Sequence, residues 1–270
     1  TLTVTSDGVE SAMPGLMDAS KVVYHELDGS QEVESRTWDV PINIVMKNCE
    51  TTTASGGNDS LGGMEILDVN KGPITYIFNQ PVNITVDGGS ASAMSLIRSN
   101  MTSNYSKWIF NAPVTFTVKN GEFSYINGMQ VLNGYNYFTE KGKNWGVEMN
   151  DTYTMTVDNC TDVTAINAAG KKNRERTWSS NNGRVDDFSC GFKKGLTLNV
   201  KDTEVSDSIV PGHILKQSGK DGGPDEQYRY WAEGDVVVNL DNVQVEDFAS
   251  SQSSKLMAGK TDLDGNLTVN

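Results

Sequence analysis

The chain has 270 residues, of which 37% are hydrophobic, and a formal net charge of −13 from 35 acidic and 22 basic side chains. This acidic balance disfavours nucleic acid and anionic membranes as partners, because a phosphate layer requires a basic surface. No stretch approaches the length of about 18 apolar residues that a membrane-spanning helix needs, so membrane insertion is not expected.

The chain opens in a strand-like segment with apolar residues at alternate positions, so an export signal is expected to have been removed or to lie upstream. Six later segments share this pattern, and an internal repeat decides the architecture. Each segment ends in Lys or Asp followed by Gly, Asn or Asp. The seven segments are 2–8, 42–48, 82–88, 114–120, 153–159, 196–202 and 236–242, and an eighth begins at 267. Their central residues are on average 39 residues apart.

A period of two indicates strands with one buried face. The central residues are expected to stack as a core column, namely Val4, Ile44, Ile84, Phe116, Met155, Leu198 and Val238. The fourteen outward positions of the same strands hold eight Thr, four Asn and two Val, with Asn43, Val45, Val237 and Asn239 among them. The other ten form a possible ligand-facing ladder of Thr3, Thr5, Asn83, Thr85, Thr115, Thr117, Thr154, Thr156, Thr197 and Asn199.

Two interpretations of this ladder stay open. Thr has a high strand propensity, and Thr and Asn can form hydrogen bonds between stacked coils. Alternatively, the ladder is a flat recognition surface for a glycan, another sheet or ice.

The end of each segment predicts a sharp corner, because Gly, Asn and Asp tolerate the left-handed backbone region. The corner residues are Gly8, Asn48, Gly88, Asn120, Asn159, Asp202 and Asn242. The charged residues before them alternate in sign as Asp7, Lys47, Asp87, Lys119, Asp158, Lys201 and Asp241. Since neighbouring strands lie about 4.8 Å apart, this order predicts stacking of successive repeats with opposite charges adjacent.

Alternation resumes after the corner, which predicts a second strand. A third strand is marked by Trp38, Trp108, Trp145 and Trp231, each a few residues before the next segment. Three strands per repeat predict an all-β fold, a right-handed parallel β-helix of about seven coils that forms a single domain over residues 1–270. The excess length is expected in variable loops at 18–36, 56–72, 134–144, 170–191 and 217–228.

Both ends of the chain lie in the first strand of the repeat, without a Pro-rich, charged or helical cap. Solenoid ends expose unpaired backbone groups and apolar surface. The 270 residues are therefore expected to be part of a longer solenoid, or to meet neighbouring chains at their ends.

Short strands with Val and Ile inside, Thr and Asn outside, and Asn or Gly corners resemble the β-helical passenger domains of bacterial autotransporters, the pertactin-like surface adhesins. The resemblance covers the whole chain as architecture and implies an extracellular or cell-surface location. It implies attachment or aggregation without catalysis, through a host glycan, a host surface protein or self-association through coils. Two alternatives stay open: a polysaccharide-active lyase or hydrolase on a pectate-lyase-like β-helix, and a phage tailspike segment.

Candidate chemical residues are few. Cys49 and Cys160 share an inward repeat position, too far apart for a disulfide, and Cys190 is expected in a loop. His25 and His213 have no nucleophile or acid at a catalytic spacing. Residues 262–266 resemble the start of a calcium loop but lack its closing Glu, and 171–176 is a basic run interrupted by Glu. No catalytic residue, metal site or cofactor is predicted.

Overall fold

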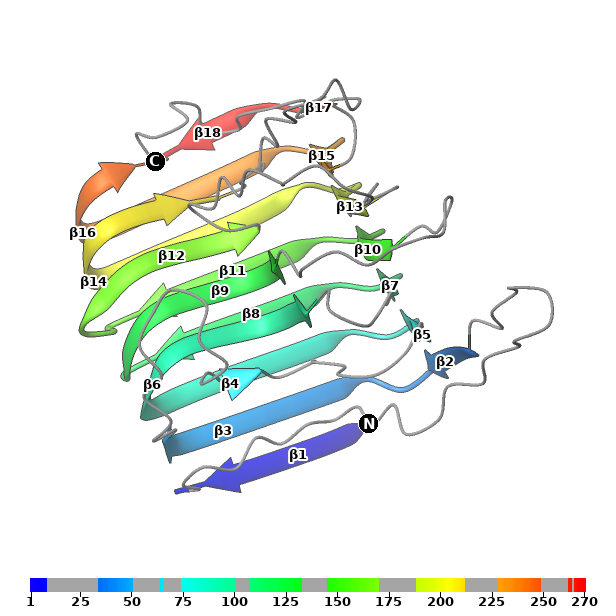
Figure 1. Ribbon diagram of the computed structural model, residues 1–270, viewed down its shortest axis with the longest axis horizontal. Coiled ribbons are helices and arrows are strands. Elements are labelled where there is room, and N and C mark those ends of the chain that lie inside the picture. Colours follow the sequence, from blue (N-terminus) through cyan, green and yellow to red (C-terminus); the bar gives the residue numbers. More distant parts are fainter. Residues whose placement is uncertain are drawn as a thin grey trace, which may run out of the picture.

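The structure is a computed structural model that describes residues 1–8, 34–50, 64–65, 74–100, 107–132, 145–169, 188–211, 228–248, 262–263 and 265–270. Within these ranges every named element is a β-strand, and the strands form two sheets of parallel neighbours (Figure 1). The predicted all-β, parallel solenoid is therefore confirmed. In the described part of the chain, no helix is long and apolar enough to cross a bilayer.

The first face of the solenoid contains the repeated segments. Its strands stack in chain order from β1 to β18 (Figure 1). They are β1 (Leu2–Asp7), β3 (Ile42–Glu50), β6 (Val82–Asn100), β8 (Val114–Lys119), β11 (Tyr153–Asp158), β14 (Leu196–Val210), β16 (Val236–Phe248) and β18 (Leu267–Val269).

The register of this face follows the repeat residue for residue, which confirms the predicted core column. Val4 pairs with Ile44, and the column continues through the central residues up to Val238. From Ile44 to Val238 these side chains are at most 1% exposed. Val4 is only half-buried, because β1 pairs with β3 alone among the described strands.

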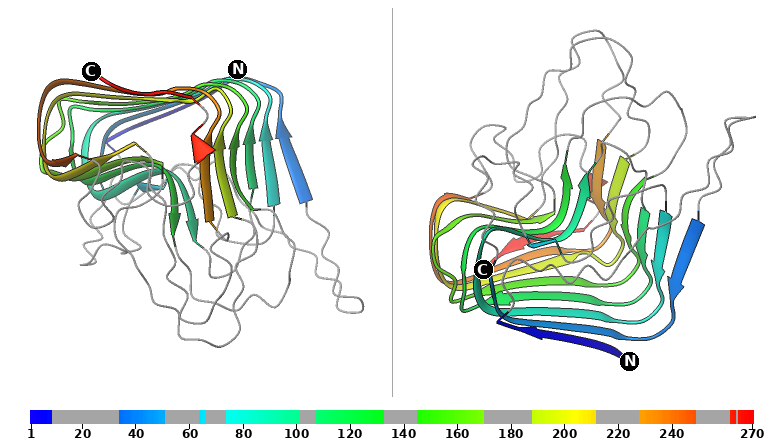
Figure 2. Two further views of the ribbon diagram at one scale, coloured as in Figure 1. Left: turned by 90° about the horizontal axis from the view of Figure 1, so that it is seen from above. Right: turned by 60° about the horizontal axis from the view of Figure 1, so that its bottom comes forward.

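The first and second faces meet at the predicted corner. All seven expected corner residues have φ between 46° and 76°, in the left-handed region. Gly, Asn and Asp reach this region at the lowest cost, which explains why the position holds no other residue type. Beyond the corner the chain turns back as the second face (Figure 2). This face comprises the later parts of β6, β14 and β16 together with β4 (Met64–Glu65), β9 (Glu122–Leu132) and β12 (Val163–Ala169).

The third face is a separate sheet, and three residues separate the end of each of its strands from the next strand of the first face. It comprises β2 (Glu34–Trp38), β5 (Ile74–Phe78), β7 (Lys107–Phe110), β10 (Trp145–Met149), β13 (Phe188–Phe192), β15 (Tyr228–Ala232) and β17 (Asp262–Leu263). The four Trp markers lie in these strands but not in one column. Trp108 pairs with Tyr76, whereas Trp38 pairs with Phe78.

Aromatic rings stack between neighbouring rungs of this third face. The rings of Phe78 and Phe110 lie 4.7 Å apart, and Trp38 stacks on Phe78 at 6.4 Å. Tyr76 and Trp108 form a second stack at 6.2 Å. Stacked rings bury a large apolar area, so they hold the third face against the core.

Two parts of the prediction differ from the structure. All three faces are described in the repeats that start at 42, 82, 114, 153, 196 and 236, whereas the repeat that starts at 2 has no described strand on the second face. The expected seven complete coils therefore exceed what the structure shows. Four predicted loops also contain strand residues, because β2 begins at Glu34, β4 lies within 56–72, β13 begins at Phe188 and β15 begins at Tyr228. The remainder of the five predicted loops lies outside the described residues.

Candidate functional site

The predicted ladder lies on the outer side of the first face as two parallel columns, which we call the ladder face. One column begins at Thr3 and contains, in rung order, Asn43, Asn83, Thr115, Thr154, Thr197, Val237 and Thr268. The second begins at Thr5 and continues through Val45, Thr85, Thr117, Thr156, Asn199 and Asn239. Thr3, Thr5 and Asn83 are exposed, and the other predicted members are half-buried.

Side-chain amides connect neighbouring rungs of the ladder face. Asn83 Nδ2 donates to Asn43 Oδ1 at 3.0 Å, and Asn239 Nδ2 donates to Asn199 Oδ1 at 2.7 Å. Asn199 Nδ2 in turn donates to Thr156 Oγ1 at 3.2 Å. These bonds use part of each amide's capacity, because an amide group has two N–H donors and an oxygen with two lone pairs. The ladder residues therefore form hydrogen bonds between stacked coils, as the first interpretation states. This bonding is compatible with the second interpretation, in which the ladder face recognises a partner.

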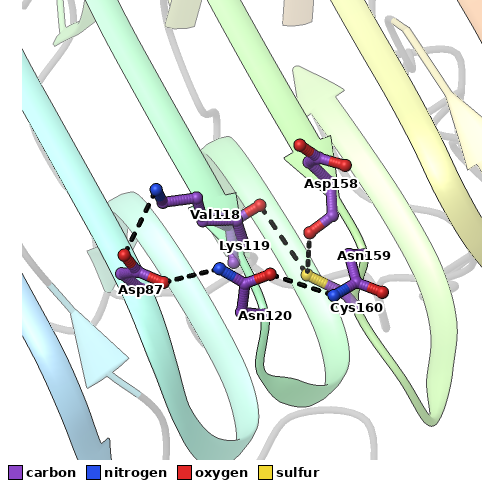
Figure 3. Close-up of polar contacts among 7 residues, drawn as sticks. All are labelled: Asp87, Val118, Lys119, Asn120, Asp158, Asn159 and Cys160. Atoms are coloured by element: carbon purple, nitrogen blue, oxygen red, sulfur yellow. Dashed lines mark hydrogen bonds and ion pairs between the residues drawn. The ribbon is translucent and has the colours of Figure 1, made fainter.

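A third outward column flanks the ladder face and consists of the alternating charges. Strand pairing places Asp7 beside Lys47 and continues the alternation to Asp241, as predicted. Lys119 Nζ lies 3.2 Å from Asp87 Oδ2, and both side chains are about one-third exposed (Figure 3). The hydrogen bond from Asn120, with Lys119 beside it, lowers the pKa of the Asp87 carboxyl below its ordinary value.

The corner adds a row of amide bonds beside this charge column. Asn120 Nδ2 donates to Asp87 Oδ1 at 2.7 Å, and Asn159 Nδ2 donates to Asn120 Oδ1 at 3.0 Å (Figure 3). Asn242 similarly donates to Asp202 at 2.7 Å. Each of these three asparagines therefore bonds to the preceding rung as well as turning the chain.

Cys49 and Cys160 are hydrogen-bond donors of the corner. Cys49 Sγ donates to the carbonyl of Lys47 at 3.3 Å, and Cys160 Sγ donates to that of Asp158 at 3.6 Å (Figure 3). Thr203 occupies the equivalent position, and its hydroxyl donates to the carbonyl of Lys201 at 2.7 Å. Both thiols are free and buried, which confirms the predicted inward position. The sequence analysis missed this donor role. The presence of Cys in two repeats and Thr in a third at the same position could have indicated it, because both side chains can donate a hydrogen bond.

Replacing Cys160 by Thr should make the free energy of unfolding decrease less as the pH rises into the alkaline range. Burial raises the pKa of the Cys160 thiol from 9.0 to about 11 in the folded chain. The protonated thiol contributes its full share to the free energy of unfolding below the unfolded pKa of about 9. This contribution is lost as the pH rises to about 11. Across this window the original chain should lose about 2–3 kcal/mol more unfolding free energy than Cys160→Thr. Urea unfolding of both chains at about pH 8 and pH 11 measures this, and identical pH dependence would contradict it.

A second row of amides, which the sequence analysis missed, follows the third face. Asn79 donates to Asp39 at 2.7 Å, Asn111 donates to Asn79 at 2.8 Å, and Asn150 donates to Asn111 at 2.6 Å. The row stops at the next rung, where Lys193 stands and binds Glu148 at 3.3 Å. The signal was an Asp or Asn directly after the last residue of β2, β5, β7 and β10. The row fixes the edge at which the third face turns into the ladder face.

The other candidate residues are not brought together. Cys190 was wrongly expected in a loop, because it lies in β13, whose backbone pairs with β10 and β15. The segment 262–266, which resembles the start of a calcium loop, begins with strand β17, which pairs with β15. His25, His213 and the basic run 171–176 lie outside the described residues. Among the residues that are described, no three His, Cys, Asp or Glu side chains gather into a group that could hold a metal ion.

No family model, curated protein or solved structure matches this chain. The functional argument therefore depends on the fold, the ladder face and the charges beside it.

Proposed function

We propose that this chain is the β-helical part of an extracellular protein of a bacterial surface, which mediates attachment or aggregation without catalysis. The ladder face carries this proposal. Its hydroxyl and amide groups repeat with the spacing of the rungs, about 4.8 Å. A polar polymer such as a glycan, or a polar protein surface, offers matching donors and acceptors along its length. This role agrees with the resemblance to pertactin-like passenger domains.

The geometry of the face favours binding because its side chains are already ordered. Thr is restricted at χ1, and the Asn amides are held by bonds such as that from Asn239 to Asn199. Most ladder residues are half-buried between neighbouring rungs. Binding to such a surface costs little side-chain entropy, so weak polar contacts over many rungs can add up to useful affinity.

A binding screen with a ladder variant tests this function. The chain is presented to arrayed glycans and host surface proteins, beside the double variant Thr115→Arg/Thr154→Arg. The two arginines project from the centre of the ladder face and should reduce binding by at least about tenfold, since they prevent close approach of a partner. Thr161→Arg is the matched control, because Thr161 is exposed beyond the corner. Binding that both variants retain equally would exclude the ladder face as the recognition surface.

A further inference from the structure

The charge column and the ladder face together define a surface that is complementary to itself. Seven charges alternate along one flank of the face, from Asp7 on β1 to Asp241 on β16, in strict register with the rungs. The two ladder columns beside them carry no charge. A second copy of such a surface meets opposite charges only in particular orientations, so the alternation restricts how two copies can pair.

We propose that the ladder face binds the ladder face of a second copy of this chain, with the two solenoids antiparallel. The two-fold axis runs along the strand direction and passes between β8 and β11. This inference rests on the proposed function, since it names the partner of the same face. The rotation leaves each column on its own counterpart and reverses the order of the rungs. Strand β8 then faces β11 of the second copy, β6 faces β14, and β3 faces β16.

The alternating charges require an axis between two rungs, and the position between β8 and β11 overlaps all eight strands of the face. With the axis between β8 and β11, Lys119 faces Asp158, Asp87 faces Lys201, and Lys47 faces Asp241, each pair occurring twice by symmetry. An axis through β8 itself would set Lys119 against Lys119. A two-fold axis along the solenoid would place the charge column over the opposite flank of the ladder face. Only an axis between two rungs pairs every overlapping charge with its opposite.

The uncharged columns are compatible with the same arrangement. At its centre Thr115 faces Thr154 and Thr117 faces Thr156, and hydroxyls can donate and accept in either direction. The eight strands of the face span about 34 Å at a spacing of about 4.8 Å, and six residues of strand span about 20 Å. The resulting area of about 680 Å² per copy is close to the roughly 800 Å² per partner of a standard protein interface.

Charge reversal followed by mixing tests the arrangement. The 270-residue chain, Lys119→Asp and Asp158→Lys are each analysed by sedimentation velocity from low micromolar to millimolar protein. In Lys119→Asp both central pairs become Asp against Asp, and in Asp158→Lys both become Lys against Lys. Each variant alone should dimerise at least about tenfold more weakly than the original chain. An equimolar mixture should form a heterodimer of nearly original affinity, because both central pairs are again opposite.

A second pair of variants guards against local misfolding. Asp87→Lys and Lys201→Asp face each other in the same arrangement and should show the same loss and rescue. Glu122→Lys is the control, because Glu122 is exposed beyond the corner and should leave dimerisation unchanged. A chain that stays monomeric at millimolar concentration, or reversed variants that dimerise as the original does, overturns the antiparallel pairing. The proposed function fails separately, if the Thr115→Arg/Thr154→Arg variant binds its screened partners normally.

Discussion

Replacing Phe116 by Ala is expected to lower the free energy of unfolding by about 3–5 kcal/mol. The Phe116 side chain is 0% exposed and lies in the core column between Ile84 and Met155. Truncation removes its burial energy and leaves a cavity whose walls are strands in fixed register. Those walls are restrained by pairing on both sides, so they can collapse only slightly into the space.

Thr115→Ala is the matched control for this change, because Thr115 is the adjacent residue of the same strand on the outward side. Its replacement should cost less than about 1 kcal/mol, since the side chain is half-buried and no core contact is lost. Urea unfolding followed by the fluorescence of Trp108 and the other tryptophans measures both variants. Equal losses at the two positions would contradict the assignment of Phe116 to the core and of Thr115 to the outer side.

The first face could be predicted from the sequence because, in a solenoid, residues that are one repeat apart in the sequence are neighbours in the structure. Equivalent residues of successive repeats lie on adjacent rungs, so the pattern at Phe116 also fixes its neighbours Ile84 and Met155. The alternating charges added the register, since slippage by one rung would place like charges together. The corner followed from the few residue types that accept a left-handed backbone.

Contacts across the core could not be predicted in this way, because they join different positions of the repeat. Tyr153 begins a strand of the first face, yet its hydroxyl donates to the carbonyl of Ala168 on the second face at 3.4 Å. A Cβ at Gly128 would overlap that hydroxyl, so glycine is required there. The repeat pattern contains no information about such a pair. It depends on how far one side chain reaches across the solenoid.

Only those parts of the candidate site that follow the alternation within a strand could be predicted from the sequence. The ladder columns follow from alternation within one strand, and all ten predicted members lie on the outer side of the first face. The amide row from Asp39 to Asn150 was missed, because its members lie between strands, where no alternation marks them. The hydrogen bonds of Cys49 and Cys160 depend on corner geometry that composition does not reveal.

The corner at Gly88 and Gly89 should tolerate substitution poorly, and Gly89→Ala is expected to lower the free energy of unfolding by about 2–5 kcal/mol. Gly89 has φ +89°, which costs an L-residue about 1–2 kcal/mol. A Cβ there would also overlap the carbonyl oxygen of Cys49 on the neighbouring rung and would lie 2.7 Å from its backbone nitrogen. Backbone atoms paired in a sheet cannot move aside, so overpacking adds about 1–3 kcal/mol.

Gly8→Ala separates the two contributions, because Gly8 has a comparable left-handed φ of +62°, but no atom of the described residues lies within 4 Å of an added Cβ. Its replacement should cost only the backbone term, about 1–2 kcal/mol. The difference between the two variants in urea unfolding therefore reports the close approach of the Cys49 backbone alone. If Gly89→Ala is no more destabilising than Gly8→Ala, the rungs at this corner are not packed as closely as the structure places them.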